Sequence, residues 1–257
     1  MKELDSSLMY QVRTIGHGQK MGNGTKENTK SYIKSYIDVR KKVFIWCAYL
    51  VFFFLISIFI HECGHGLANA LRGIECSTGF YSVEYDIPVS GFGNFRAHHI
   101  LEVSSAMLDL GVPATLILAV IGTVLFYRLK GERGKTIALG IAVTNSVMRL
   151  MPCLGVVIIP LLTGHPYKED EYSMGLAVAA ATGYSWSIYL PAFVSILVSM
   201  ICIICLYIKL KMKMSMSFKT FCCRGYFVLV SFYISVIIAV ILDYYVRINW
   251  PAIHFHT

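Results

Sequence analysis

The sequence predicts an α-helical polytopic membrane protein with about five transmembrane helices and a small β-rich insertion. Of its 257 residues, 56% are hydrophobic and only 15% are charged. A soluble domain cannot easily bury that much apolar surface, so the lipid bilayer is the natural solvent. The apolar residues also gather in long runs, and the first of these, Val43–Ile60, contains no charged residue. Such runs are typical of membrane-crossing helices, which need about 20 apolar residues.

The elements before the second span can be taken in order. Residues 1–42 are polar and basic, and we expect them to form a mobile cytoplasmic tail. The first span follows, and its helix should continue to about Leu71 because nothing breaks it before Gly73. The segment 73–100 then combines several glycines, a proline and partly alternating aromatic residues. That pattern predicts a small hairpin or edge strands.

The rest of the chain supplies the remaining spans. Three are expected over Val103–Tyr127, Thr136–Leu162 and Gly225–Leu242. The run Tyr172–Ile208 has no charged residue and is too long for one span. We therefore expect a break near Thr182–Ser187 or at Pro191, which separates a short, re-entrant segment from a full span. These assignments make five crossings.

The basic residues predict how the chain lies in the membrane. Net charge is +8, and most of the 23 basic residues lie in residues 1–42 and in the loops Arg128–Lys135 and Lys209–Arg224. Cytoplasmic loops attract this excess. The pattern predicts a multi-pass protein of the cell membrane with its N-terminus in the cytoplasm and its C-terminus outside. It does not favour a nucleic-acid partner, because the basic residues flank apolar runs.

One motif in the first span carries chemistry. The letters "HECGH" form an HExxH pattern, which places His61 and His65 one helical turn apart on the same face. Two imidazoles in that arrangement can bind one Zn²⁺, and Glu62 on the adjoining edge can take a proton from the attacking water. Titratable residues at membrane depth are costly and are functional by default. We therefore interpret the motif as part of a site for peptide-bond hydrolysis.

A catalytic zinc needs a third protein ligand and an open position. Because His61 lies near the far end of its span, the ligand must come from the extracytoplasmic side of the other spans. The residues at a compatible level are Asp170 with its neighbours Glu169 and Glu171, Asp109, and His165. The choice stays open on these grounds alone. His98 and His99 are interpreted as polar residues of the outer insertion.

The run "FIHECGHGLANALRG" resembles the site-2 protease family of intramembrane zinc metalloproteases. The resemblance covers about Val43–Met174, in which the insertion, a Gly-Val-Pro element at Gly111 and an Asn- and Pro-bearing segment follow in the family's order. It implies a zinc metalloendopeptidase with Asp170 as the third ligand, since that residue follows a further crossing. The family's NxxPxxxxDG is not intact here, and Asp109 in "LDLG" remains the alternative.

Two further residues were assigned roles. Asn145 is predicted either to orient the substrate carbonyl and stabilise the oxyanion, or to make an interhelical hydrogen bond. Arg149 at mid-span needs a partner or a water-filled cavity, and it is expected to pair with an acidic residue near the site, in a structural role more than a catalytic one. We also hypothesise that an edge within Phe80–Tyr85 pairs with an unwound substrate by strand addition.

The leading interpretation is thus a protease that acts on membrane-embedded or membrane-adjacent protein substrates. Its domains are the tail 1–42, a metalloprotease core 43–174 and the C-terminal membrane helices 175–257. The alternatives are a catalytically inactive protease-like scaffold or receptor and, less favoured by the sequence, a metal transporter.

Overall fold

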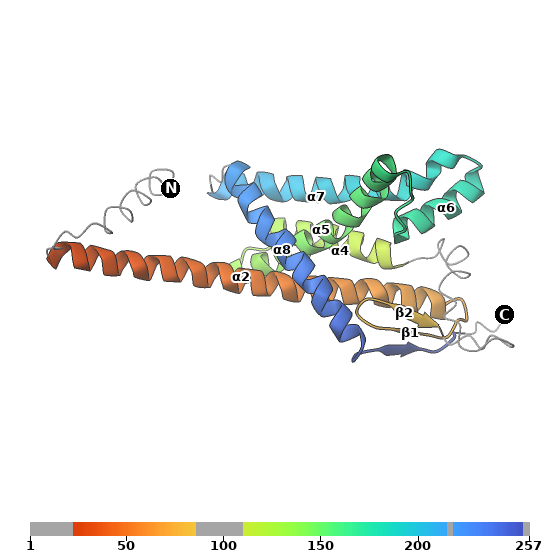
Figure 1. Ribbon diagram of the computed structural model, residues 1–257, viewed down its shortest axis with the longest axis horizontal. Coiled ribbons are helices and arrows are strands. Elements are labelled where there is room, and N and C mark those ends of the chain that lie inside the picture. The colour runs from red at the N-terminus through yellow and green to blue at the C-terminus, as the bar shows by residue number, and fades with distance from the viewer. Residues whose placement is uncertain (1–22, 86–109, 215–217, 254–257) are drawn as a thin grey trace. The chain divides into compact units, whose positions relative to one another are not determined.

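The computed structural model describes residues 23–85, 110–214 and 218–253. The elements in chain order are α2 (Asn23–Ala70), β1 (Cys76–Thr78), β2 (Val83–Tyr85), α4 (Gly111–Arg128), α5 (Glu132–Thr163), α6 (Asp170–Thr182), the 3₁₀ helix η2 (Ser185–Tyr189), α7 (Leu190–Met214), α8 (Phe218–Asp243) and β3 (Ile248–Trp250) (Figure 1). The chain divides into two compact units, Met1–Trp46 and Cys47–Thr257. Every residue of the site discussed below lies in the second unit.

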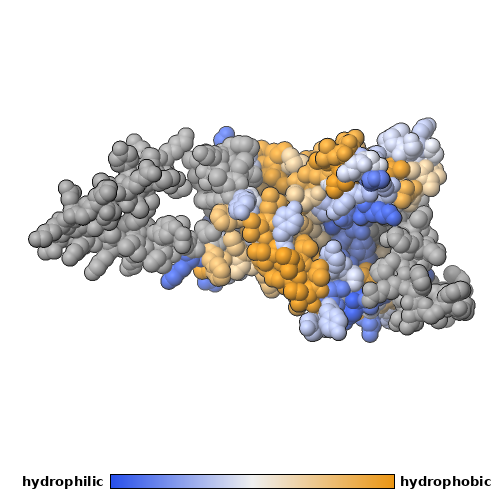
Figure 2. Space-filling model, in the orientation of Figure 1, coloured by the Kyte–Doolittle hydropathy of each residue, from blue (hydrophilic) through white to orange (hydrophobic). Residues whose placement is uncertain are grey.

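Five of the described helices are long and apolar enough to cross a membrane. They cover Phe44–Ala70, Gly111–Arg128, Glu132–Thr163, Ser185–Met212 and Gly225–Asp243. Large apolar side chains on their outer faces are exposed, as lipid-facing side chains are expected to be; Figure 2 shows them gathered over α8. The predicted class, an α-helical polytopic membrane protein with a small β-rich element, is confirmed.

Helix α2 starts earlier than the sequence predicted. It begins at Asn23, so the last part of the segment taken as a mobile tail is helical. No proline interrupts residues 23–42, and the apolar run that follows provides a stable helix onto which additional turns can form without a new nucleation step. The other end agrees with the prediction: α2 stops at Ala70, and Gly73 takes the left-handed conformation with φ of 75°.

The insertion forms the predicted hairpin, and it gains a third strand. Strand β1 pairs antiparallel with β2, in the register Ser77 to Glu84. It also pairs antiparallel with β3 near the end of the chain, in the register Ser77 to Asn249. The order β2-β1-β3 leaves β1 in the centre. Strand β3 was not predicted, because its three residues are too few to carry a strand pattern of their own.

The long apolar run after the loop at 164–169 is broken where expected. Helix α6 ends at Thr182, and Gly183 follows in the left-handed conformation with φ of 75°. The 3₁₀ helix η2 then leads into α7. At 13 residues, α6 is too short to cross a bilayer, whereas the segment Ser185–Met212 is long enough.

Helix α5 holds the second unit together, because it contributes to all three apolar core clusters. Met148 packs in a cluster with Phe54 of α2 and Phe232 of α8. Ala138 and Ala142 pack with residues of α4 and α7. Further along α5, Cys153 and Val156 pack with Ala192 of α7 and, at the cluster's edge, Tyr167 and Tyr172. The side chains of α5 that face α2 and α6 are therefore held from several directions.

Candidate metal centre

The two histidines of the HExxH motif face each other across one turn of α2. His61 is buried, with 4% of its surface exposed, and its Nε2 lies 3.1 Å from Nε2 of His65. The ring centroids are 4.5 Å apart and the rings stand nearly perpendicular. Two Nε2 atoms that point at one location are the arrangement expected of two metal ligands at positions i and i+4.

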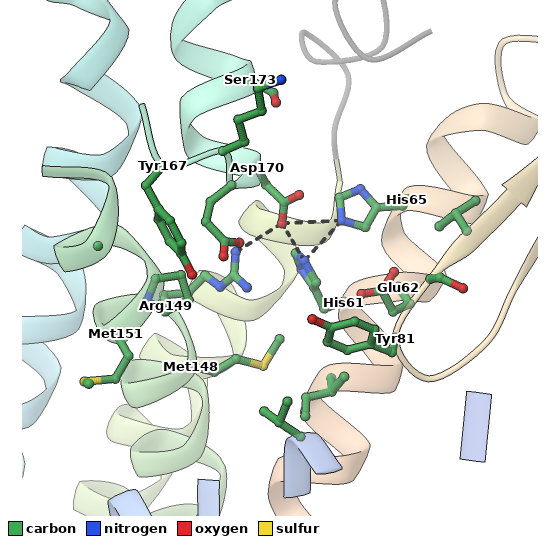
Figure 3. Close-up of a pocket in the computed structure, with 18 of the residues that line it drawn as sticks. His61, Glu62, His65, Tyr81, Met148, Arg149, Met151, Tyr167, Asp170 and Ser173 are labelled. Atoms are coloured by element: carbon green, nitrogen blue, oxygen red, sulfur yellow. Dashed lines mark hydrogen bonds and ion pairs between the residues drawn. The ribbon is translucent and has the colours of Figure 1, made fainter. Parts of the chain in front are cut away.

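The third group at this location is Asp170, the first residue of α6. Its Oδ2 lies 2.8 Å from His61 Nε2 and 3.6 Å from His65 Nε2 (Figure 3). Burial acts to raise the pKa of Asp170, but the charge of His65 and the hydrogen bonds from both histidines outweigh it, so the pKa lies well below its usual range. The carboxylate form, which can ligate a cation, is therefore the favoured one.

The donor set fits a zinc ion. With metal–ligand bonds of about 2.0–2.1 Å, tetrahedral ligands lie about 3.3 Å from one another. The three ligand atoms of His61, His65 and Asp170 are separated by 2.8, 3.1 and 3.6 Å. Two imidazole nitrogens and one carboxylate oxygen are also ligands that zinc accepts. Among the described residues, this is the group of His, Cys, Asp and Glu that could hold a metal ion.

The three residues lie on a cavity of about 820 Å³, a size typical of ligand sites. Its wall includes Glu62 of α2, Arg72 in the turn that follows α2, Arg149 of α5, and Tyr81 and Val83 of the hairpin segment. Residues of α8 complete the lining. Figure 3 shows Glu62 beside the two histidines. A metal ion held by the three ligands would therefore face a cavity large enough for a peptide segment.

Glycines let neighbouring elements approach the motif helix on two sides. A Cβ added at Gly64 would lie 2.7 Å from Cα of Gly111, and one added at Gly111 would lie 2.7 Å from His61 Nδ1. On the other side, a Cβ at Gly66 would overlap Trp250 of β3 and Thr78 of β1. The two glycines of "HECGHG" therefore admit the start of α4 and the sheet, which together enclose the histidines.

Arg149 pairs with acidic residues at the site, as the sequence predicted. Its Nη1 lies 3.2 Å from Glu171 Oε1 and 3.6 Å from Asp170 Oδ2. The Arg149 side chain is 5% exposed and that of Glu171 is 0% exposed. Leaving one member of such a buried pair alone typically costs about 3–5 kcal/mol. Glu171, weighed at first as another possible ligand, is thus the counter-ion of the arginine.

Asn145 does not join the cavity wall. Its side chain is buried, and its Nδ2 donates a 2.9 Å hydrogen bond to the carbonyl of Ile141 in its own helix. Among the described residues, this amide donates a hydrogen bond within α5 and not to a neighbouring helix, and its buried Oδ1 has no hydrogen-bond partner.

The other residues weighed as ligands lie elsewhere or outside the described residues. Glu169 lines the cavity without belonging to the triad, and His165 is exposed in the connection between α5 and α6. Asp109, His98 and His99 lie outside the described residues. The family resemblance implied Asp170 in preference to Asp109, and Asp170 is the carboxylate that the structure brings together with the two histidines.

One cluster near the cavity was missed by the sequence reasoning. Asp243, the last residue of α8, accepts hydrogen bonds from the backbone N–H of Tyr81 and from both the N–H and the hydroxyl of Ser82. Arg247 pairs with Glu84 and with Asp243 itself. A Cβ at Gly79 would collide with Asp243. The only sequence signal was an isolated Asp and Arg after an apolar span.

Comparison of the chain with protein-family models, with curated proteins and with solved structures gives no match. The site therefore has to be interpreted from its own chemistry.

Proposed function

We propose that the protein is an intramembrane zinc metalloprotease of the site-2 protease type, which hydrolyses peptide bonds of membrane-embedded or membrane-adjacent protein substrates. The observation that carries the proposal is the convergence of His61, His65 and Asp170, beside Glu62, on one cavity. Two histidines and a carboxylate with an open position are a donor set used by catalytic zinc. A zinc ion held there would polarise the scissile carbonyl and lower the pKa of a water to about 7.

Glu62 is the residue to which we assign proton transfer. It neighbours His61 in the chain and lines the same cavity as the three ligands. A general base has to lie at such a site to take a proton from the attacking water. The oxygen of the attacking water bonds to the carbonyl carbon, and Glu62 accepts the proton that the water releases. Glu62 then passes this proton to the amine nitrogen as the C–N bond breaks. The carboxylate is thereby restored for the next cycle.

Strand β2 is the element to which we assign the substrate backbone. Helical substrates hide their peptide bonds, so the chain has to be held extended before the carbonyl can be attacked. In the order β2-β1-β3, β2 is an edge strand of the described sheet, and Val83 lines the cavity. The backbone N–H groups of Tyr81 and Ser82 already donate hydrogen bonds to Asp243. The part of the edge that is available for strand addition is therefore Val83–Tyr85.

The orientation we propose places the N-terminus and the basic loops in the cytoplasm and the metal centre toward the extracytoplasmic side. Residues 129–131, flanked by Arg128 and Lys135, join α4 and α5 at the ends of these helices that lie opposite Gly111 and Thr163. The site is built from the start of α4, where Gly111 approaches His61, and from the second half of α5. Labelling of single cysteines at Lys130 and at His165 with an impermeant maleimide tests this: His165→Cys should be labelled from outside and Lys130→Cys only after permeabilisation.

The decisive experiment compares wild type with Glu62→Gln. The full chain is purified in detergent, its zinc content is measured by mass spectrometry, and cleavage of a single-pass membrane protein is followed. Glu62→Gln should keep the metal and lose cleavage, because the ligands stay and the proton acceptor is gone. Glu132→Gln is the matched control, since Glu132 is exposed at the start of α5, and it should behave as wild type.

Other outcomes favour the alternatives. A protein that binds zinc but cleaves nothing in any form is the inactive scaffold or receptor. Metal flux into vesicles that contain the purified protein, without cleavage, identifies a metal transporter. A transporter requires metal-binding sites along several spans, whereas the described residues form one group that could hold a metal ion.

A further inference from the structure

Arg149 is a buried cation in the wall of the proposed active site. It lies in the middle of α5, 4% exposed, and it lines the same cavity as the two histidines. A charged side chain in a membrane-crossing segment is costly and is retained for a function. Its Nη1 lies 3.6 Å from Asp170 Oδ2, the oxygen that contacts His61 (Figure 3). The positive charge is thus next to the location where the ligands converge.

The arginine does not need Asp170 as its counter-ion. Glu171 is nearer, at 3.2 Å, and it is fully buried, so it balances the charge of Arg149. Asp170 can then serve the metal. Both contacts use Nη1, and the buried Nε has no hydrogen-bond partner among the described residues. A guanidinium carries five N–H donors in a planar fork, so donors beyond these two contacts are left for another acceptor.

The residue expected to stabilise negative charge does not reach the cavity. Asn145 uses its amide within α5 and is absent from the cavity wall. Arg149 lies one turn further along the same face of the helix, and it does line the cavity. An oxyanion stabiliser contributed by α5 is therefore Arg149, which brings a full charge as well as hydrogen-bond donors.

We propose that Arg149 is a catalytic residue that donates hydrogen bonds to the oxyanion formed on the substrate carbonyl. When the water oxygen bonds to the carbonyl carbon, the C=O π electrons move to oxygen, and the guanidinium stabilises that charge without giving up a proton. The released proton goes to Glu62 as described above. This inference rests on the proposed function. Removing one donor of this kind typically lowers kcat by about 10²–10³-fold.

The experiment uses binding and not activity. The full chain in detergent is loaded with Co²⁺, whose visible absorption reports changes at the metal, and is titrated with inorganic phosphate and separately with imidazole. Phosphate is a tetrahedral oxyanion, whereas imidazole is a neutral ligand for an open position. Arg149→Met should weaken phosphate binding at least about tenfold and leave imidazole binding and cobalt content within about twofold of wild type.

Arg72→Met is the matched control. Arg72 lines the same cavity, whereas the ion pairs of Asp170 are those with His61, His65 and Arg149. Phosphate binding in this variant should stay within about threefold of wild type, because a general loss of one cavity charge is a weaker effect than loss of a directed donor. Equal effects of the two substitutions on phosphate binding would overturn the proposal.

Arg149→Met can leave Glu171 as an unpaired buried charge and prevent folding. Arg149→Met combined with Glu171→Gln avoids this, and Glu171→Gln alone is its reference; the same selective loss of phosphate binding is expected. Unchanged phosphate binding overturns the proposal, as does a parallel loss of imidazole or cobalt, which would make Arg149 a positioning residue for Asp170. A wild-type protein that takes up no cobalt or zinc would instead overturn the proposed function, and this inference with it.

Discussion

The two halves of the candidate metal centre are built in different ways. The histidine half comes from a single turn of α2, where His61 and His65 are four residues apart. The carboxylate half needs α5, the connection after Thr163 and the start of α6 to bring Asp170 to His61, a separation of 109 residues. Helical geometry determines the first half, whereas tertiary packing determines the second.

The difference shows in what surrounds each half. The histidine turn is enclosed by the backbone of Gly111 on one side and by the side chains of Thr78 and Trp250 on the other. Asp170 is surrounded by charge, since Arg149 and its partner Glu171 lie next to it. The histidine half should therefore be sensitive to added volume, and the carboxylate half to changes of charge.

The largest effect is expected from removing a histidine. His61→Ala leaves one imidazole and one carboxylate, too few for a stable zinc site, so the purified protein should contain almost no zinc. Zinc content measured by mass spectrometry checks this. His165→Ala, at an exposed histidine, should keep wild-type content. Full zinc occupancy in His61→Ala would show that the metal is bound elsewhere.

A smaller effect is expected at the carboxylate. Asp170→Asn keeps the shape but removes the charge of the third ligand, and zinc affinity should fall at least about 100-fold. Competition with a chromophoric chelator measures this affinity. Unchanged affinity would mean that another carboxylate is the ligand, and Asp109→Asn would then be the variant that loses zinc.

Added volume tests the enclosure of the histidine half. Gly111→Ala places a methyl group 2.7 Å from His61 Nδ1, so the ring has to move. We expect zinc affinity to fall about tenfold and the free energy of unfolding to drop by about 1–3 kcal/mol. Gly131→Ala is the control, because a Cβ there meets nothing within 4 Å and φ is −74°. Equal zinc affinity and equal unfolding free energy in the two variants would contradict the close approach of Gly111 to His61.

The smallest effect concerns pH in the metal-free protein. The pKa of Asp170 is depressed in the fold, so its ion pairs contribute stability above about pH 4, the usual Asp pKa, and that contribution is lost as pH falls through the folded-state pKa. With a chelator present, the Tm of wild type should exceed that of Asp170→Asn at neutral pH, and the gap should narrow on acidification. A gap that widens in acid would contradict the depressed pKa.

Strand β2 gives a separate test of the substrate assignment. Val83→Pro removes a backbone donor from the edge strand beside the cavity, and cleavage should fall strongly while zinc content stays at the wild-type level. Asn249→Pro, on the opposite edge of the same sheet, is the matched control, and it should reduce cleavage less than Val83→Pro does. Full cleavage by Val83→Pro would remove the strand-addition hypothesis.

Much of the architecture could be predicted because it depends on local patterns. Long apolar runs revealed the spans, Gly73 marked the end of α2, and the segment around Gly183 marked the break before α7. The helical extension back to Asn23 was missed, since polar residues alone do not distinguish a tail from a helix that an adjacent span stabilises. Strand β3 was missed because its pairing with β1 is long-range.

The sequence by itself determined the fold class and the histidine half of the site, because a 3.6-residue period places His61 and His65 together in any α-helix. Only the tertiary structure decided which charged residues meet them. Asp170 and Arg149 face the cavity while Asn145 turns into its own helix, and Glu171 pairs with the arginine. These outcomes depend on how α5 and α6 pack against α2, and residue spacing does not encode the relative rotation of separate helices.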